Sequence, residues 1–187
     1  MKLDVVTRSG ERGFARVELM VVVVLLAVIA VMATPAFVAW HLRDQVDARA
    51  KALVSTFTYA RSEALRRGAR VTVCCIDAAR QCLAASEACA NGSLDWSCGW
   101  AVILERADGQ SVLRAQPELA AVSVIGTLTD IAFIPPAGQM IGSFRSLDIA
   151  SRTPSAATGG SGWRRCVRVA AGGRARSTEG PCSGAAS

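Results

Sequence analysis

The residues best suited to bind a charged ligand are arginines near the C-terminus. Residues 163–187 contain five arginines and a single acidic residue, and they supply most of the formal net charge of +6. Arg174 and Arg176 are two residues apart, so on a strand they face the same side, and Arg164 and Arg168 share a face of the preceding strand. If the two strands pair, these side chains form a basic patch that suits phosphates. A solvated hairpin edge, whose charges deter aggregation between sheets, fits the same pattern.

Cysteines form the second set of residues with chemistry of their own. Cys166 and Cys182 flank the last predicted hairpin, and a disulfide between them would stabilise the C-terminus by about 3 kcal/mol. The other five lie close together in the sequence: Cys74, Cys75, Cys82, Cys89 and Cys98. They allow two further disulfides with one thiol left over. Their spacings do not suit a structural zinc site, so we expect no metal, and this cysteine usage indicates an exported domain.

Catalytic arrangements are not indicated. The chain has one histidine, His41, which excludes most catalytic triads and histidine-rich metal sites, and we interpret it as a surface residue. No glycine-rich phosphate loop follows a predicted strand, and the serines and aspartates have no plausible base beside them. The sequence therefore predicts a protein that is not an enzyme, with no catalytic residue and no cofactor.

A long apolar run near the N-terminus must hold the chain in a membrane. Only Glu18 and Thr34 are polar between residues 17 and 40, and at ~1.5 Å per residue a helix over this run exceeds the ~30 Å core of a bilayer. A carboxylate inside such a helix costs about 2–3 kcal/mol unless it has a partner. If the chain is cut after Gly13, the new amine of Phe14 lies about one helical turn from Glu18 and supplies that partner.

The charges that flank the run predict the topology. Lys2, Arg8, Arg12 and Arg16 lie on its N-terminal side. The positive-inside rule then leaves the N-terminus in the cytoplasm and exports the rest of the chain, which crosses the inner membrane once.

The periodicity beyond the run predicts an α+β domain. Apolar residues at helical spacing form one stripe, which consists of Leu42, Val46, Ala50, Leu53, Phe57, Ala60 and Ala64. Gly68 is a helix stop, so we expect one helix over residues 17–67, with Pro35 as a kink. Alternating patterns and turn residues predict strands at 71–76, 99–106, 111–115, 122–125, 131–134, 143–149, 164–169 and 174–177. Residues 107–110 predict a hairpin turn, and residues 77–98 and 151–162 predict loops. The amphipathic half of the helix is expected to pack on one antiparallel sheet.

The N-terminal motif resembles the class III leader of type IV pilins and pseudopilins. The resemblance rests on Gly13-Phe14, on Glu18 as the fifth residue of the cut chain, and on the apolar run that follows. It implies that a prepilin peptidase cuts after Gly13 and methylates Phe14, and that Glu18 pairs with the amine of a neighbouring subunit in a filament. The chain departs from the family by carrying Ala-Arg-Val between Phe14 and Glu18 in place of Thr-Leu-Ile. Two alternatives stay open for Arg16: its side chain extends to the lipid headgroups, or its charge weakens processing or packing.

Further stretches resemble the GspH/FimT group of minor pilins. They are Cys-Val-Arg-Val at 166–169, Gly-Arg-Ala-Arg at 173–176, Gly-Pro-Cys at 180–182, and residues 95–102 and 133–138. In FimT-like members the arginines bind DNA during natural transformation, which implies that role for Arg174 and Arg176. In GspH-like members the domain is a minor pseudopilin near the tip of a type II secretion pseudopilus.

Together these observations predict a minor pilin or pseudopilin at or near a filament tip. Its expected parts are a leader (1–13), a transmembrane and filament-core helix (14–40), an amphipathic helix (41–68) and a β-rich periplasmic domain (69–187). Its expected partners are other pilin or pseudopilin subunits, the prepilin peptidase and the inner membrane. Three hypotheses stay open: a type IV pilin that also binds DNA, a type II secretion pseudopilin that contacts only proteins, and an anchored exported protein outside any filament.

Overall fold

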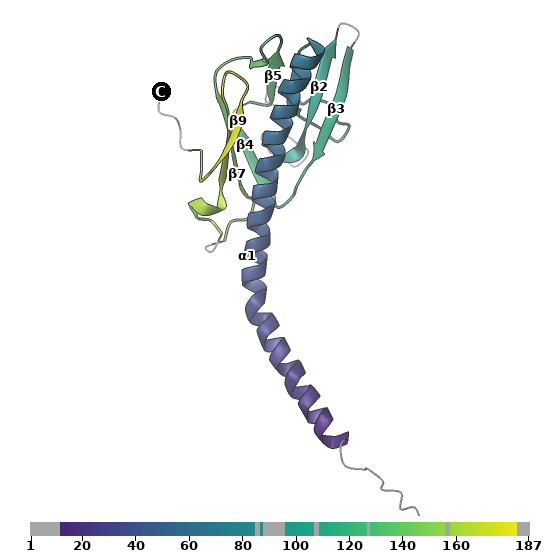
Figure 1. The fold of residues 1–187 in the computed structure, drawn as a ribbon, viewed down its shortest axis with the longest axis vertical. Coiled ribbons are helices and arrows are strands. Elements are labelled where there is room, and N and C mark those ends of the chain that lie inside the picture. Colours follow the sequence, from purple (N-terminus) through teal and green to yellow (C-terminus); the bar gives the residue numbers. More distant parts are fainter. Residues whose placement is uncertain are drawn as a thin grey trace, which may run out of the picture. The chain divides into compact units, whose positions relative to one another are not determined.

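The computed structural model describes residues 12–84, 87, 96–106, 109–126, 128–155 and 158–182. Within these residues, helix α1 (Arg12–Arg67) is followed by nine strands and two short 3₁₀ helices, η1 (Trp96–Cys98) and η2 (Ser161–Trp163) (Figure 1). The chain divides into two compact units between Trp40 and His41. Most of the predicted leader, residues 1–11, lies outside the described residues.

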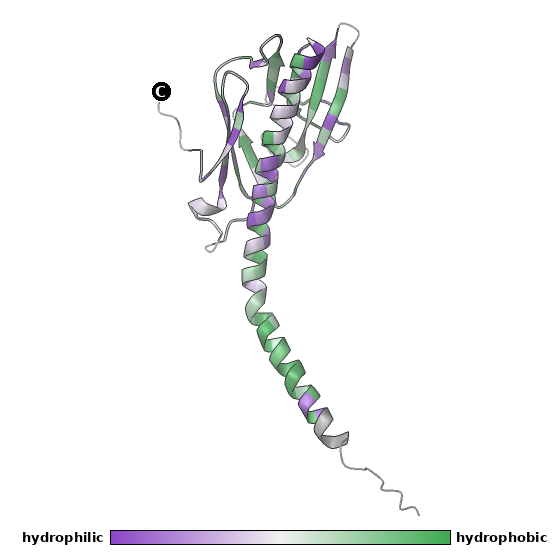
Figure 2. Cartoon of the chain, viewed as in Figure 1, coloured by the Kyte–Doolittle hydropathy of each residue, from purple (hydrophilic) through white to green (hydrophobic). Residues whose placement is uncertain are grey.

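The first unit is the apolar half of α1. In the described part of the chain, α1 is the one helix long and apolar enough to cross a membrane, and none of its most apolar stretch is buried. Figure 2 shows this half mostly in green, the colour of hydrophobic residues, with a hydrophilic stretch in purple near its start. The helix continues through Pro35, which lacks a backbone N–H, and the neighbouring Thr34 hydroxyl donates to the carbonyl of Ala30 at 2.7 Å.

The second unit begins with the amphipathic half of α1. The predicted stripe is confirmed from Val46 to Ala64, where each member is at most 2% exposed, whereas Leu42 is partly exposed. The helix ends at the predicted stop, because Gly68 has a φ of +60° that other residues rarely adopt. His41 is exposed, as predicted, and bonds to Gln45 at 3.0 Å.

Two antiparallel sheets follow where the sequence predicted one. The first has five strands, in the order β3 (Gly109–Pro117), β2 (Gly99–Arg106), β1 (Val71–Cys75), β5 (Asp130–Ile134) and β6 (Gln139–Met140). The second has four, in the order β4 (Val122–Gly126), β7 (Arg145–Ser151), β8 (Arg165–Val169) and β9 (Ala175–Glu179). Alternation identifies a strand but not its neighbour, so it could not separate β5 from β4, which lies in the other sheet.

Smaller differences concern strand ends. Gly109 and Gln110 belong to β3, whereas the sequence placed them in a hairpin turn whose other residues, 107–108, lie outside the described part. The two-residue strand β6 was not predicted. Strand β7 begins at Arg145 instead of residue 143, and it takes Ser151 from the predicted loop.

Both sheets and α1 share one hydrophobic core. Phe57 of α1 lies between aromatic rings from two parts of the chain, with its centroid 6.0 Å from that of Trp96 and 6.4 Å from that of Phe133. The same cluster contains Val102 of the first sheet and Val167 of the second. A single helix therefore covers both sheets, and each large buried side chain contributes roughly 1.5–3 kcal/mol.

A buried arginine is an unusual part of this core. Arg49 of α1 is 6% exposed, and its guanidinium carbon lies 3.9 Å from the ring centroid of Trp100. The indole N–H of Trp100 donates to the Thr56 hydroxyl at 3.1 Å, which fixes the ring. Burial lowers the pKa of Arg49 to about 10, and the charge of Glu118 opposes that shift. Folding therefore disfavours the charged form of Arg49, and its contact with Trp100 and the charge of Glu118 offset part of this cost.

We expect Arg49→Met to leave the free energy of unfolding at neutral pH unchanged or higher, because methionine fills the volume without a charge to desolvate. Arg49→Ala should lower it by about 1–2 kcal/mol, since the stem that covers Trp100 is lost. Chemical denaturation of the full chain in detergent would measure both. A loss above about 1 kcal/mol in Arg49→Met would show that the charge itself stabilises the fold.

Candidate functional site

The arginine pairs predicted from the sequence come together on the hairpin of β8 and β9. Arg168 and Arg176 are direct cross-strand partners, and the backbone N–H of Ala170 donates to the carbonyl of Arg174 at 3.0 Å. Val167 and Val169 face the core, so Arg168 faces the opposite side of the sheet, away from α1. By the same alternation Arg174 and Arg176 lie on that outer face, and both are exposed.

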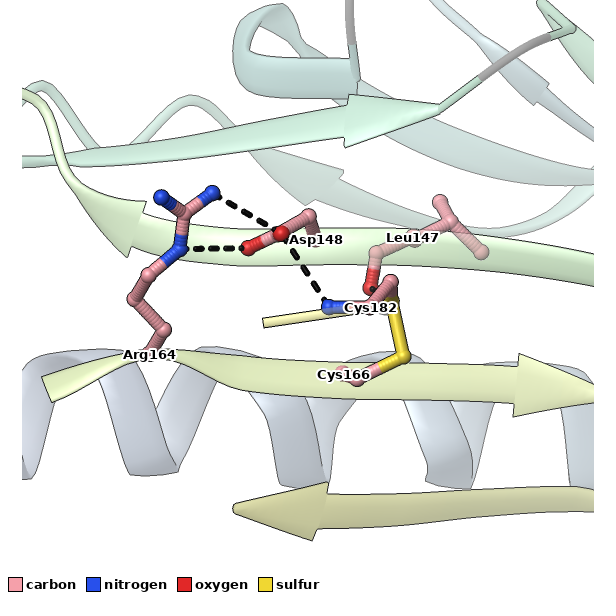
Figure 3. Close-up of a disulfide and its surroundings, with 5 residues drawn as sticks. All are labelled: Leu147, Asp148, Arg164, Cys166 and Cys182. Carbon is pink, nitrogen blue, oxygen red and sulfur yellow. Dashed lines mark hydrogen bonds and ion pairs between the residues drawn. A yellow bond between two sulfur atoms is a disulfide. The ribbon is translucent and has the colours of Figure 1, made fainter. Parts of the chain in front are cut away.

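The fourth predicted arginine has a different setting. The Arg164 side chain forms a two-point ion pair with Asp148 of β7, in which Nε lies 3.1 Å from Oδ1 and Nη2 lies 2.8 Å from Oδ2 (Figure 3). Its charge is matched within the protein. The basic surface of the outer face therefore consists of Arg168, Arg174 and Arg176, which we call the arginine patch.

A disulfide closes the C-terminal end of this face. Cys166 of β8 bonds to Cys182, as the sequence analysis expected, with 4.9 Å between their Cα atoms. The backbone N–H of Cys182 donates to Asp148 Oδ2 at 3.2 Å, so one carboxylate holds both Arg164 and the end of the chain (Figure 3). These contacts fasten the segment after β9 to β7 and β8.

Sequence reasoning missed the role of Arg165. This side chain lies on the inner face of the hairpin, 7% exposed, where Nε forms an ion pair with Asp47 of α1 and Nη2 lies 3.4 Å from Glu179. Arg43 of α1 also approaches Glu179, at 3.8 Å. Alternation along the strand could have revealed this role, because it puts Arg165 on the same face as Val167 and Val169, opposite to Arg164 and Arg168.

A tight contact at the turn between β8 and β9 fixes where the patch begins. Gly173 has a φ of +77°, and a Cβ there would lie 2.2 Å from the carbonyl oxygen of Gly138, which is beyond β5 in the other sheet. The same turn accepts a backbone hydrogen bond, from Met140 N–H to the Ala171 carbonyl at 3.0 Å. Nε of Arg61 on α1 donates to the Gly138 carbonyl at 3.2 Å. Helix and both sheets therefore meet at Gly173.

Comparison with known proteins agrees with this fold. The family described as Type II transport protein GspH matches residues 49–173. The chain belongs to the GspH family. Two crystal structures of the type IV minor pilin FimU from Pseudomonas aeruginosa share the fold. The first is 17% identical, covers 73% of this chain and 98% of FimU, and has a TM-score of 0.53. The second is 18% identical, covers 76% of this chain and 92% of FimU, and has a TM-score of 0.52. No curated protein matches the sequence.

The family match ends immediately before Arg174, so it contains neither Arg174 nor Arg176. It also begins after the apolar half of α1. Family membership thus makes this chain a pilin-like subunit of the GspH type with a pilin-like fold, and the functions of the arginine patch and of the N-terminal motif stay predictions.

The N-terminal motif of this GspH-family chain lies at the start of α1. The backbone of Gly13 and Phe14 is helical, and Glu18 is exposed on the helix. The carboxylate therefore stands on the surface of an apolar helix, where lipid or another subunit would meet it.

The remaining cysteines agree with the expectation of two further disulfides and one remaining thiol, as far as the structure describes them. Cys74 pairs with Cys82, and Cys98 is also in a disulfide, while Cys89 lies outside the described residues. Cys75 is buried in the core. Within the described residues, no group of three His, Cys, Asp or Glu side chains is placed to hold a metal ion.

Gly173→Ala should lower the free energy of unfolding by about 2 kcal/mol or more, because the new Cβ strains a left-handed residue and displaces Gly138. The matched control is Gly172→Ala, where a Cβ meets nothing within 4 Å, and we expect a change within about 0.5 kcal/mol. Equal losses in the two variants, measured by denaturation of the full chain in detergent, would contradict this account of the turn.

Proposed function

We propose that this GspH-family protein is a filament subunit that waits in the inner membrane. The apolar half of α1 carries the proposal, because its most apolar stretch is exposed along its whole length. Apolar surface of this extent needs lipid or other apolar helices around it. The membrane supplies the first environment and the core of a filament the second, with a single pass that leaves the N-terminus in the cytoplasm and the second unit in the periplasm.

Glu18 is the residue that distinguishes a filament subunit from a simple membrane anchor. A carboxylate on an exposed apolar helix is costly in lipid and gains most from a cation in the same low-dielectric setting. Cleavage after Gly13 by the prepilin peptidase would create such a cation at Phe14. The amine of an adjacent subunit would then satisfy Glu18 as the subunits stack, which makes filament entry favourable.

We expect Glu18→Ala to reduce recovery of this protein in sheared filaments by tenfold or more, because one charge pair of roughly 1.4 kcal/mol already corresponds to about that factor. Its amount in the inner membrane should not change. Thr34→Ala is the control, since the Thr34 hydroxyl bonds only within its own helix, to Ala30. Normal filament recovery of Glu18→Ala would instead favour an anchored protein outside any filament.

We further propose that the arginine patch binds the phosphate backbone of DNA. Arg168 and Arg176 lie directly opposite each other on the paired strands, so an anion on the outer face would meet more than one guanidinium group. Arg174 extends the same face toward the turn. Guanidinium groups suit phosphate oxygens, and the outer face is turned away from the core that holds the fold.

Duplex DNA should bind the full chain in zwitterionic detergent micelles with an affinity that falls as salt rises, because each neutralised phosphate adds about −0.9 to the log–log slope. The double variant Arg174→Ala, Arg176→Ala should weaken binding and make that slope shallower by the amount that about two phosphate contacts contribute. Its matched control removes two exposed arginines of the first sheet, Arg106→Ala and Arg114→Ala, and should change both quantities less. Fluorescence anisotropy with a labelled duplex measures both.

Two results would contradict DNA binding. One is the absence of binding at low salt by a folded chain, and the other is an equal loss in the control variant, which would show attraction to net charge alone. Either result would favour a secretion pseudopilin whose domain contacts only proteins.

A further inference from the structure

Strand β9 leaves one edge of the second sheet open in the described part of the chain. It pairs with β8 and is last in the order of its sheet. The N–H of Gly180 donates to the Arg164 carbonyl, and the N–H of Ala170 donates to the Arg174 carbonyl. Arg174 and Gly180 thus both bond toward β8, and so does every second residue of the segment that runs from one to the other. The residues in between, Ala175, Ser177 and Glu179, therefore turn their N–H and C=O groups to the open side.

A groove runs beside this edge. It has a volume of about 430 Å³ and separates β9 from the outward face of α1. Five hydroxyl-bearing side chains line it together with Lys51 and the apolar Val54, and they are Ser177 of β9 and Ser55, Thr58, Tyr59 and Ser62 of α1. An open strand edge next to a groove is the arrangement that peptide-binding domains use to add a strand, because the edge binds the backbone and the groove takes alternate side chains.

The charges around the edge select the occupant. Arg176 extends from β9, Arg174 directly precedes the strand, and Lys51 lines the groove. The one acidic residue of the strand, Glu179, is already approached by Arg165 and Arg43. A segment added to β9 would thus meet a net positive surface.

We propose that β9 binds an extended, acidic segment of a partner protein as an added strand. Its alternate side chains would be acidic, facing Arg174 and Arg176, and small or hydroxyl-bearing, entering the groove. A second copy of β9 fits less well, because it would bring two further arginines to the same edge. This site shares Arg174 and Arg176 with the proposed DNA surface, but it also needs the open backbone edge of β9 and the groove, which DNA binding does not, so a variant at the edge separates the two proposals.

Ser177→Pro tests the edge directly. Proline removes an N–H that faces the open side and leaves the bonds toward β8, which is the position where edge strands tolerate it. The probe is a fluorescein-labelled peptide of about nine residues in which Asp alternates with Val and Ser, and its partner probe carries Lys in place of Asp. We expect the full chain in zwitterionic detergent to bind the Asp peptide in preference to the Lys peptide, and Ser177→Pro to weaken this binding by about tenfold or more.

A second variant tests the groove without touching the edge. Ser55→Trp should fill the groove and weaken binding of the Asp peptide as well. Gln110→Trp, at an exposed position of the other sheet, should leave that binding unchanged. Thermal unfolding establishes that each variant is folded, and duplex DNA binding by Ser177→Pro should equal that of the unchanged protein.

Three outcomes would overturn the proposal. The first is that the chain binds the Asp and Lys peptides equally, or that it binds neither of them. The second is full peptide affinity in a folded Ser177→Pro variant. The third is self-association of the chain that rises with concentration in analytical ultracentrifugation, is abolished by Ser177→Pro and is not inhibited by the Asp peptide. That result would make the edge an interface between copies of this chain.

Discussion

The burial of the apolar stripe of α1 is the interaction on which the rest of the second unit depends. Val46 through Ala64 face inward over five helical turns, and strands of both sheets pack against them. Phe57 stands at the centre, in contact with Trp96 and Phe133. Without the helix, each sheet would expose one apolar face to water, and two sheets with no continuous ladder between them would have little else to hold them together.

The same constraint determines which arginines are available to a ligand. Because β8 must present Val167 and Val169 to the core, Arg165 faces inward and Arg168 faces outward. The inward arginine is matched by Asp47 and Glu179, and Arg164 is matched by Asp148. Five arginines that look equivalent in the sequence are thus divided, because the packing of the two valines turns Arg165 inward, Asp148 pairs with Arg164, and Arg168, Arg174 and Arg176 remain on the outer face.

Sequence patterns predicted what local periodicity encodes. The end of α1 before Gly68, strand β2 and the hairpin of β8 and β9 follow from spacing and turn residues alone, whereas α1 begins at Arg12 instead of the predicted residue 17. The division into two sheets was not predictable, because it depends on which strands pair across long stretches of chain. Asp148 lies 16 residues before Arg164, and Gly138 lies 35 residues before Gly173, so neither contact leaves a signal in a single sequence.

The last hairpin separates two chemistries that one strand can present. Its outer face carries guanidinium groups toward solvent, whereas its edge and inner side offer backbone groups next to a hydroxyl-lined groove. Strand alternation keeps the inner side and the outer face of the hairpin apart, so a substitution such as Ser177→Pro can change the edge without altering the arginine side chains. The contact of Gly173 with Gly138 holds both at the junction of helix and sheets, which explains why a glycine stands directly before the two arginines. A subunit built in this way can keep its core and its filament helix unchanged while the short hairpin adapts to nucleic acid or to protein.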